Sequence, residues 1–166
     1  MKLKRIFRHF LTGDIAVQRT FPAASMAAIA AAIKASELGH DGEICFAVEA
    51  SMNTLPLLKN VSARERALEV FSQLRVWDTA RNNGVLIYLL LADHDVEIVA
   101  DRGIHAVVGN AGWELICREM EAYFRRGEFE SGVIAGIQAI GNHLQQAFPT
   151  TQQGGDNELP DTPHVL

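Results

Sequence analysis

The stretch that decides the fold runs from Asn82 to Ile104 and reads Asn-Asn-Gly-Val-Leu-Ile-Tyr-Leu-Leu-Leu-Ala-Asp-His-Asp-Val-Glu-Ile-Val-Ala-Asp-Arg-Gly-Ile. Residues 85–91 form a continuous apolar run of strand length, which is typical of a strand buried on both faces. After a polar turn at 93–95, residues 96–100 form a second strand. We therefore predict a β-hairpin at the heart of a sheet, with its two outer ends side by side.

Strand and helix patterns alternate around this hairpin. We expect a strand at 43–49 and helices at 24–38, 62–77, from 110 or 112, and 129–148. Ser62 and Glu65 have the spacing of a capping box at the start of the second helix. The strand–helix–strand order predicts a right-handed crossover, so strands 43–49 and 85–91 should be parallel. The fold class is α/β, a three-layer α/β/α sandwich with a small mixed β-sheet flanked by helices.

Composition excludes several classes of protein. The chain has 166 residues, 48% of them hydrophobic and 21% charged, with a net charge of −5. These values fit one globular domain, and the absence of a basic stripe outside the N-terminus argues against a nucleic-acid partner. Cys45 and Cys117 do not have a zinc-binding spacing, so they are interpreted as free thiols in a reducing compartment.

The sequence divides into three parts. Residues 1–20 form a basic N-terminal segment, residues 21–149 the α/β/α domain, and residues 150–166 a polar tail expected to be disordered. Residues 1–12 have the pattern of a short basic amphipathic helix. Four interpretations of this segment stay open: a helix on an anionic membrane surface, a helix on a partner, a helix docked on its own domain, or a solvated tail. The alanine-rich run that follows is too short to span a bilayer. We expect a cytoplasmic protein, with peripheral membrane contact left open.

Polar residues gather at the open end of the hairpin. Asn82 and Asn83 precede the first strand, Asp101 and Arg102 follow the second, and Asp78 lies nearby in sequence. Asp101 and Asp78, with the amide oxygens, are candidate ligands for a hard cation, whereas Arg102 suits a phosphate or carboxylate. The structural alternative is a turn with a local ion pair.

A second candidate cluster lies at the opposite sheet edge. Because strand 43–49 should run parallel to 85–91, Glu49 should approach Asp93 and Asp95. These acids are candidate ligands for a divalent metal, or they form only a polar hairpin tip. The sequence contains no phosphate-binding loop or nucleotide fingerprint, and no nucleophile stands in a recognisable spacing from a base.

Residues 82–87 and 96–104, together with Phe-Arg-Arg-Gly-Glu-Phe-Glu-Ser-Gly at 124–132, resemble the TPM domain family of thylakoid-lumen phosphatase-like and photosystem II repair proteins and their bacterial relatives. The resemblance covers about residues 24–148 and implies an α/β/α sandwich. It also implies aspartates that bind calcium at one sheet edge, and weak phosphatase activity in some members. This chain departs from the family at Asn110, where relatives often have Asp. It resembles a short form without signal peptide or transmembrane helix.

Two functional hypotheses follow. The first is a non-enzymatic domain that binds a partner protein through the hairpin-end cluster, which would serve as its recognition or ion site. This hypothesis includes binding at a membrane surface. The alternative is a divalent-cation-dependent phosphatase-like hydrolase. No cofactor is certain; calcium or magnesium, if bound, should be bound weakly, and whether the chain is an enzyme stays open.

Overall fold

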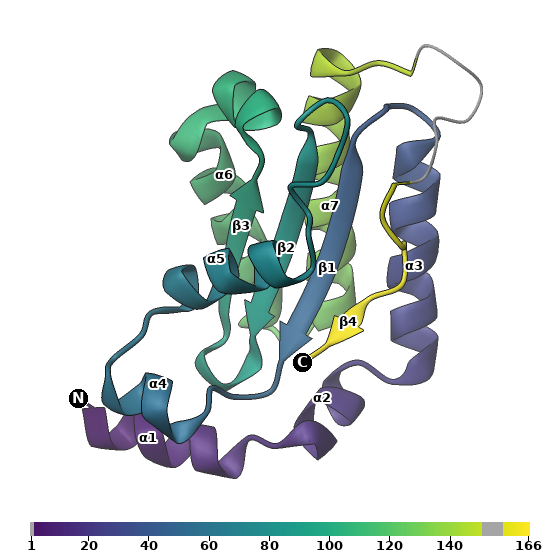
Figure 1. Cartoon of the computed structure of the whole chain (residues 1–166). Coiled ribbons are helices and arrows are strands. Elements are labelled where there is room, and N and C mark those ends of the chain that lie inside the picture. Colours follow the sequence, from purple (N-terminus) through teal and green to yellow (C-terminus); the bar gives the residue numbers. More distant parts are fainter. Residues whose placement is uncertain (1, 151–157) are drawn as a thin grey trace.

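The computed structural model describes residues 2–150 and 158–166 (Figure 1). One sheet has the strand order β3-β2-β1-β4. β1 (Glu43–Glu49) runs parallel to both β2 (Gly84–Leu90) and β4 (His164–Val165), whereas β3 (Asp95–Ala100) runs antiparallel to β2. The α/β class, the crossover and the central hairpin are therefore confirmed.

Helices cover both faces of the sheet. α5 (Ala63–Gln73) lies on one face, and α3 (Ala23–Glu37), α6 (Arg102–Phe124) and α7 (Phe129–Ala147) lie on the other (Figure 1). The remaining short elements are α1 (Lys2–Leu11), α2 (Asp14–Thr20), α4 (Thr54–Leu58) and the 3-10 turn η1 (Leu91–Asp93). The predicted capping box is present, with the Ser62 side chain accepting from the Glu65 amide. None of the described helices combines the length and apolar character needed to cross a membrane.

The central strand β2 divides the core in two. Val85, Ile87 and Leu89 belong to the cluster beneath α3, α6 and α7. Their neighbours Leu86, Tyr88 and Leu90 belong to the cluster beneath α5. All six side chains are fully buried. Both faces of this strand are apolar because a helix layer covers each face, as predicted from the sequence.

The helix after the hairpin begins earlier than the sequence predicts. α6 begins at Arg102, whose amide donates to Asp101 Oδ1 at 2.7 Å, rather than at Asn110 or Gly112. Gly109 has non-helical dihedrals (φ 70°, ψ 170°) and divides α6 into two helical pieces. Asp101 is therefore an N-cap, and the predicted start corresponds to the second piece.

The end of the chain lies against the domain. β4 pairs with β1, and the Leu166 amide donates to Val48 O at 3.0 Å. The Glu43 carboxylate accepts from the amides of Glu158 (3.1 Å) and Leu159 (3.2 Å). Residues 158–166 thus differ from the disordered tail expected from their polarity, because the β1 edge supplies their hydrogen-bond partners. Residues 151–157 of that tail lie outside the described residues.

Candidate functional site

The open end of the hairpin interlocks with the start of α6. Asn82 has a left-handed backbone (φ 53°), and its carbonyl oxygen accepts from the amides of Gly103 (2.9 Å) and Ile104 (3.4 Å). Arg102 Nε donates to Asn82 Oδ1 at 3.2 Å, and the Asp101 amide donates to Gly84 O at 2.9 Å. The structure therefore brings three of the predicted residues together: Asn82, Asp101 and Arg102.

Two other residues of that cluster have different surroundings. Asn83 is fully buried, and its Nδ2 donates to Asp41 O at 2.8 Å. Asp78 is half exposed and pairs with Arg75 at 2.5 Å. The five residues thus share a sheet edge but do not line one common exposed site.

The hairpin end offers few oxygens to a cation. Asp101 Oδ2 and Asn83 Oδ1 are buried and have no hydrogen-bond partner among the described residues. Calcium takes six to eight oxygen ligands. Within residues 2–150 and 158–166, no group of three or more His, Cys, Asp or Glu side chains could hold a metal ion. The described residues at the hairpin end therefore do not fit a complete calcium site.

At the opposite edge, Glu49 is part of a buried network. Its carboxylate accepts two hydrogen bonds from Arg66, at 2.8 and 3.2 Å, and one from the Tyr88 hydroxyl at 2.6 Å. Burial, and then the hydrogen bond to Glu49, raise the pKa of Tyr88 above its usual value. The Glu49 hydrogen bonds likewise raise the pKa of Arg66. Tyr88 and Arg66 therefore retain their protons to higher pH than the free side chains do.

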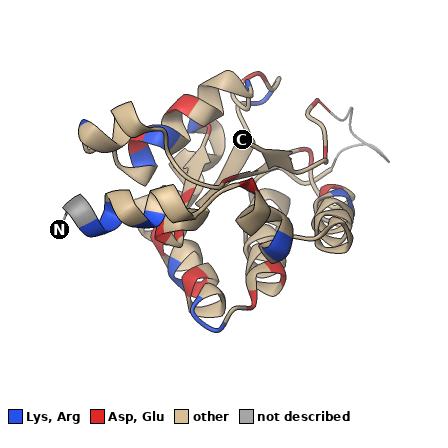
Figure 2. Ribbon diagram, turned by 90° about the horizontal axis from the view of Figure 1, so that it is seen from below, with Lys and Arg blue, Asp and Glu red and all other residues tan. Residues whose placement is uncertain are grey.

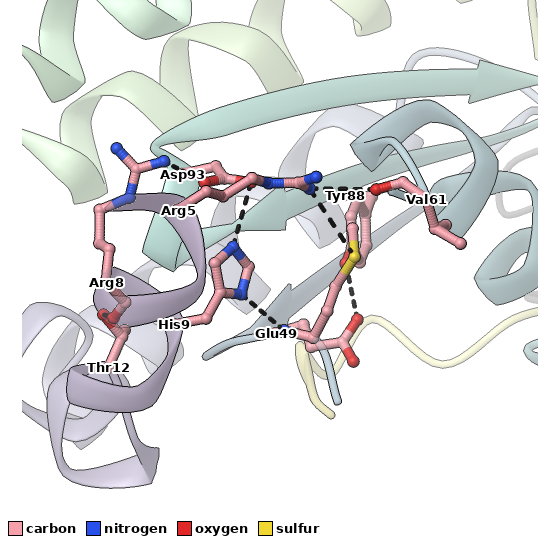
Figure 3. A network of polar contacts seen from close by, with 9 residues as sticks. Arg5, Arg8, His9, Thr12, Glu49, Val61, Tyr88 and Asp93 are labelled. Carbon is pink, nitrogen blue, oxygen red and sulfur yellow. Dashed lines mark hydrogen bonds and ion pairs between the residues drawn. The ribbon is translucent and has the colours of Figure 1, made fainter. Parts of the chain in front are cut away.

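Asp93 is held by α1 (Figure 3). Arg5 Nε donates to Asp93 Oδ2 at 2.8 Å, Arg8 pairs with the other oxygen, and His9 Nε2 lies 3.2 Å from Oδ2. Burial favours a higher pKa for Asp93, but the contacts with Arg5, Arg8 and His9 outweigh it and hold the pKa below its usual value. Glu49 and Asp93 are thus each neutralised by their own arginines.

Asp95, the third predicted acid, lies instead in a groove at the outer edge of β3. The groove is a cavity of about 480 Å³ between α5 and α6. Its lining includes four carboxylates and two guanidiniums, from Asp95, Glu97, Glu114, Glu121, Arg64 and Arg118. Of these residues only Asp95 was predicted as a site residue from the sequence; the period-two spacing of Asp95 and Glu97 is the signal that could have added Glu97.

The groove has an electrostatic bias toward cations. Burial, then the carboxylates of Glu121 and Asp93, raise the pKa of Asp95. Burial and the charge of Asp95 likewise raise the pKa of Glu97. Burial also raises the pKa of the Cys117 thiol on the groove wall to about 12, so that thiol is a poor nucleophile.

Comparison with known proteins identifies the family. A model of the TPM domain matches residues 17–143. The chain belongs to the TPM domain family. The NMR structure of the BA42 protein from the psychrophilic bacterium Bizionia argentinensis is similar, with 30% identity, a TM-score of 0.76, and coverage of 88% of this chain and 95% of BA42.

A second TPM-like fold is more distant in sequence. The solution structure of the N-terminal domain of a P. gingivalis protein has 19% identity and a TM-score of 0.62, covering 76% of this chain and 77% of that domain. At this identity the likeness concerns the fold. No curated protein matches the chain.

Proposed function

We propose that this TPM domain is a recognition domain that binds an extended, basic segment of a partner protein along the free edge of β3. The observation that carries the proposal is the groove of about 480 Å³ that follows this edge between α5 and α6. Edge strands bind extended peptides by main-chain hydrogen bonds, and neighbouring pockets select side chains.

The register leaves part of the β3 backbone facing the groove. Because the Asp101 amide bonds Gly84 O, alternate residues Val99, Glu97 and Asp95 direct their backbone groups at β2. Val96 and Ile98 therefore direct theirs outward. Arg64 Nη1 donates to Ile98 O at 2.5 Å. A charged side chain at this position commonly prevents an edge strand from pairing with other chains. The Arg64 side chain is 46% exposed, so a competing strand can displace it.

The charge of the groove selects a basic segment. Four carboxylates face two guanidiniums, and the carboxylates of Asp95 and Glu97 have raised pKa values. A lysine or arginine side chain entering the groove relieves this repulsion, whereas an acidic side chain increases it.

The contacts of the predicted metal residues favour binding over the phosphatase-like alternative. A hydrolase needs a metal or a general base within reach of a water. Glu49 is engaged by Arg66 and Tyr88, and Asp93 by Arg5 and Arg8. These ion pairs support a structural role for both acids.

Titration of the labelled protein with a capped peptide of alternating valine and arginine, followed by amide chemical shifts, tests the proposal. We expect the largest shifts at Val96, Ile98 and Trp113. Arg64→Ala should strengthen binding because it frees Ile98 O, and Glu121→Lys should weaken it by about fivefold or more through repulsion.

Two controls decide between specific and general attraction. Glu119→Lys, at an exposed position of α6 outside the groove, should leave the affinity unchanged. A peptide with glutamate in place of arginine should not bind. Shifts spread over other acidic surfaces, or equal binding of both peptides, would contradict the proposal.

A further inference from the structure

The polarity of α1 is inverted relative to an ordinary surface helix. Its inner side is charged: Arg5 bonds Asp93 and also donates to Val61 O at 3.1 Å, and His9 Nδ1 accepts from the Met52 amide at 3.0 Å (Figure 3). A surface helix normally turns its apolar stripe toward the core. Here the polar side chains, together with the half-buried Ile6, hold the helix on the domain, and the other large apolar side chains lie outside.

The outward apolar face is large. On α1, Phe7, Phe10 and Leu11 have helical spacing and are 66–72% exposed, and Ile15, in α2 beyond the break at residues 12–13, is 65% exposed. A shallow apolar hollow of about 400 Å³ lies on the same face, lined by Lys4, Ile6, Phe7 and Phe10. Exposed apolar patches rimmed by polar groups mark contact surfaces.

The rim of this patch is basic, although the protein is acidic. Residues 2–20 contain five Lys or Arg and one acid, Asp14, whereas the whole chain has a net charge of −5. Figure 2 shows the face on which α1 crosses the molecule, with its blue basic segments. Exposed Lys4 and Arg8 flank the apolar stripe. An anionic surface would attract this face and repel the rest of the protein.

We infer that the outer face of α1 and the start of α2 dock on an anionic lipid bilayer. Aromatic and aliphatic side chains enter the boundary between headgroups and acyl chains, and the exposed Lys4 contacts lipid phosphates while Arg8 keeps its ion pair with Asp93. An anionic lipid surface fits this patch because apolar side chains are combined with a basic rim on a chain whose net charge is −5. The Asp93 contacts hold α1 in place, so binding needs no folding of this segment. This surface is separate from the β3 groove.

Flotation of the full chain with vesicles tests the inference. Wild-type protein should float with vesicles of phosphatidylcholine mixed with phosphatidylglycerol, and much less with phosphatidylcholine alone. Added salt should weaken binding because the basic rim is screened. The double variant Phe7→Ser/Phe10→Ser should lose about tenfold or more of its partitioning, and Lys4→Glu should lose part of it.

Matched variants control for general effects of the substitutions. Leu38→Ser and Leu115→Ser, also at exposed leucines, and Lys34→Glu on α3 should float as wild type does. Circular dichroism melting should be unchanged for all variants, since every altered side chain is exposed. With anionic vesicles containing a spin-labelled lipid, the amide signals of α1 should broaden first.

Three outcomes would overturn the inference. They are absence of flotation with anionic vesicles, equal flotation of Phe7→Ser/Phe10→Ser and wild type, and a wild-type dimer that this double variant abolishes. The last result would assign the patch to a second copy of the chain.

Discussion

The Gly103 amide lies 2.9 Å from the carbonyl oxygen of Asn82, and a Cβ on Gly103 would lie 2.5 Å from that same oxygen. The start of α6 and the start of the hairpin thus approach too closely for any side chain. This relationship explains why Asn-Gly and Asp-Arg-Gly occur together in the sequence: they tie the two ends of the hairpin to the next helix.

Gly103→Ala should destabilise the protein by about 1–3 kcal/mol, because backbone atoms must move to admit the methyl group. The measurement is urea unfolding followed by circular dichroism. Gly13→Ala is the matched control, since a Cβ there meets nothing within 4 Å. Equal stability of Gly103→Ala and wild type would show that the backbone around Asn82 moves away from the new methyl group without loss of stability.

Leu89→Ala and Leu90→Ala should each lower the free energy of unfolding by about 2–5 kcal/mol. These neighbouring leucines lie in different cores, one on each face of β2. Leu55→Ala, at a 70% exposed position, should change stability by less than about 0.5 kcal/mol. A small effect at either β2 position would mean that only one face of the strand is buried.

Glu49→Ala should cost about 3–5 kcal/mol, because it leaves the Arg66 guanidinium and the Tyr88 hydroxyl without their partner. Tyr88→Phe removes only the hydrogen bond from the hydroxyl to Glu49, so it should lower the free energy of unfolding by about 1 kcal/mol. Glu69→Gln, at the exposed end of the Arg66 interactions, serves as the control. If Tyr88→Phe proved as damaging as Glu49→Ala, the network would not centre on the carboxylate.

Stability should fall as pH rises, through Glu37. Burial, together with the carboxylates of Glu43 and Asp161, raises the pKa of Glu37 from its usual value of 4.5 to about 8. The folded state binds more protons than the unfolded state between these two values, so the contribution of Glu37 is present at low pH and lost toward pH 8.

Urea unfolding at a series of pH values measures this linkage. Glu37→Gln should remove the part of the slope that lies between the two pKa values, whereas the exposed Glu119→Gln should keep it. A Glu37→Gln curve parallel to that of wild type across this range would show that Glu37 titrates normally.

Calcium should bind no tighter than about millimolar, since Asp101 offers one carboxylate and Arg102 adds an opposing charge nearby. Calorimetry on wild type and Asp101→Asn tests this, because asparagine keeps the helix cap and removes the charge. Asp14→Asn is the control. A micromolar constant lost in Asp101→Asn would favour the hydrolase over the recognition domain.

The sequence by itself determined the local elements of this protein. The apolar run at 85–91 required a strand buried on both faces, the spacing of Ser62 and Glu65 required a helix start, and the alternation of strand and helix required a parallel crossover. These features depend on residues close in sequence, where periodicity and capping chemistry act directly.

Only the tertiary structure decided what each face meets. Periodicity made α1 amphipathic, but Asp93, 88 residues beyond Arg5, turned its charged side inward and its apolar side out. The β1 edge likewise paired with β4 from a tail whose composition predicts disorder, and Asn83 turned into the core toward Asp41. These orientations depend on residues far away in the sequence, because a buried polar or charged side chain must point toward a hydrogen-bond partner in the folded chain.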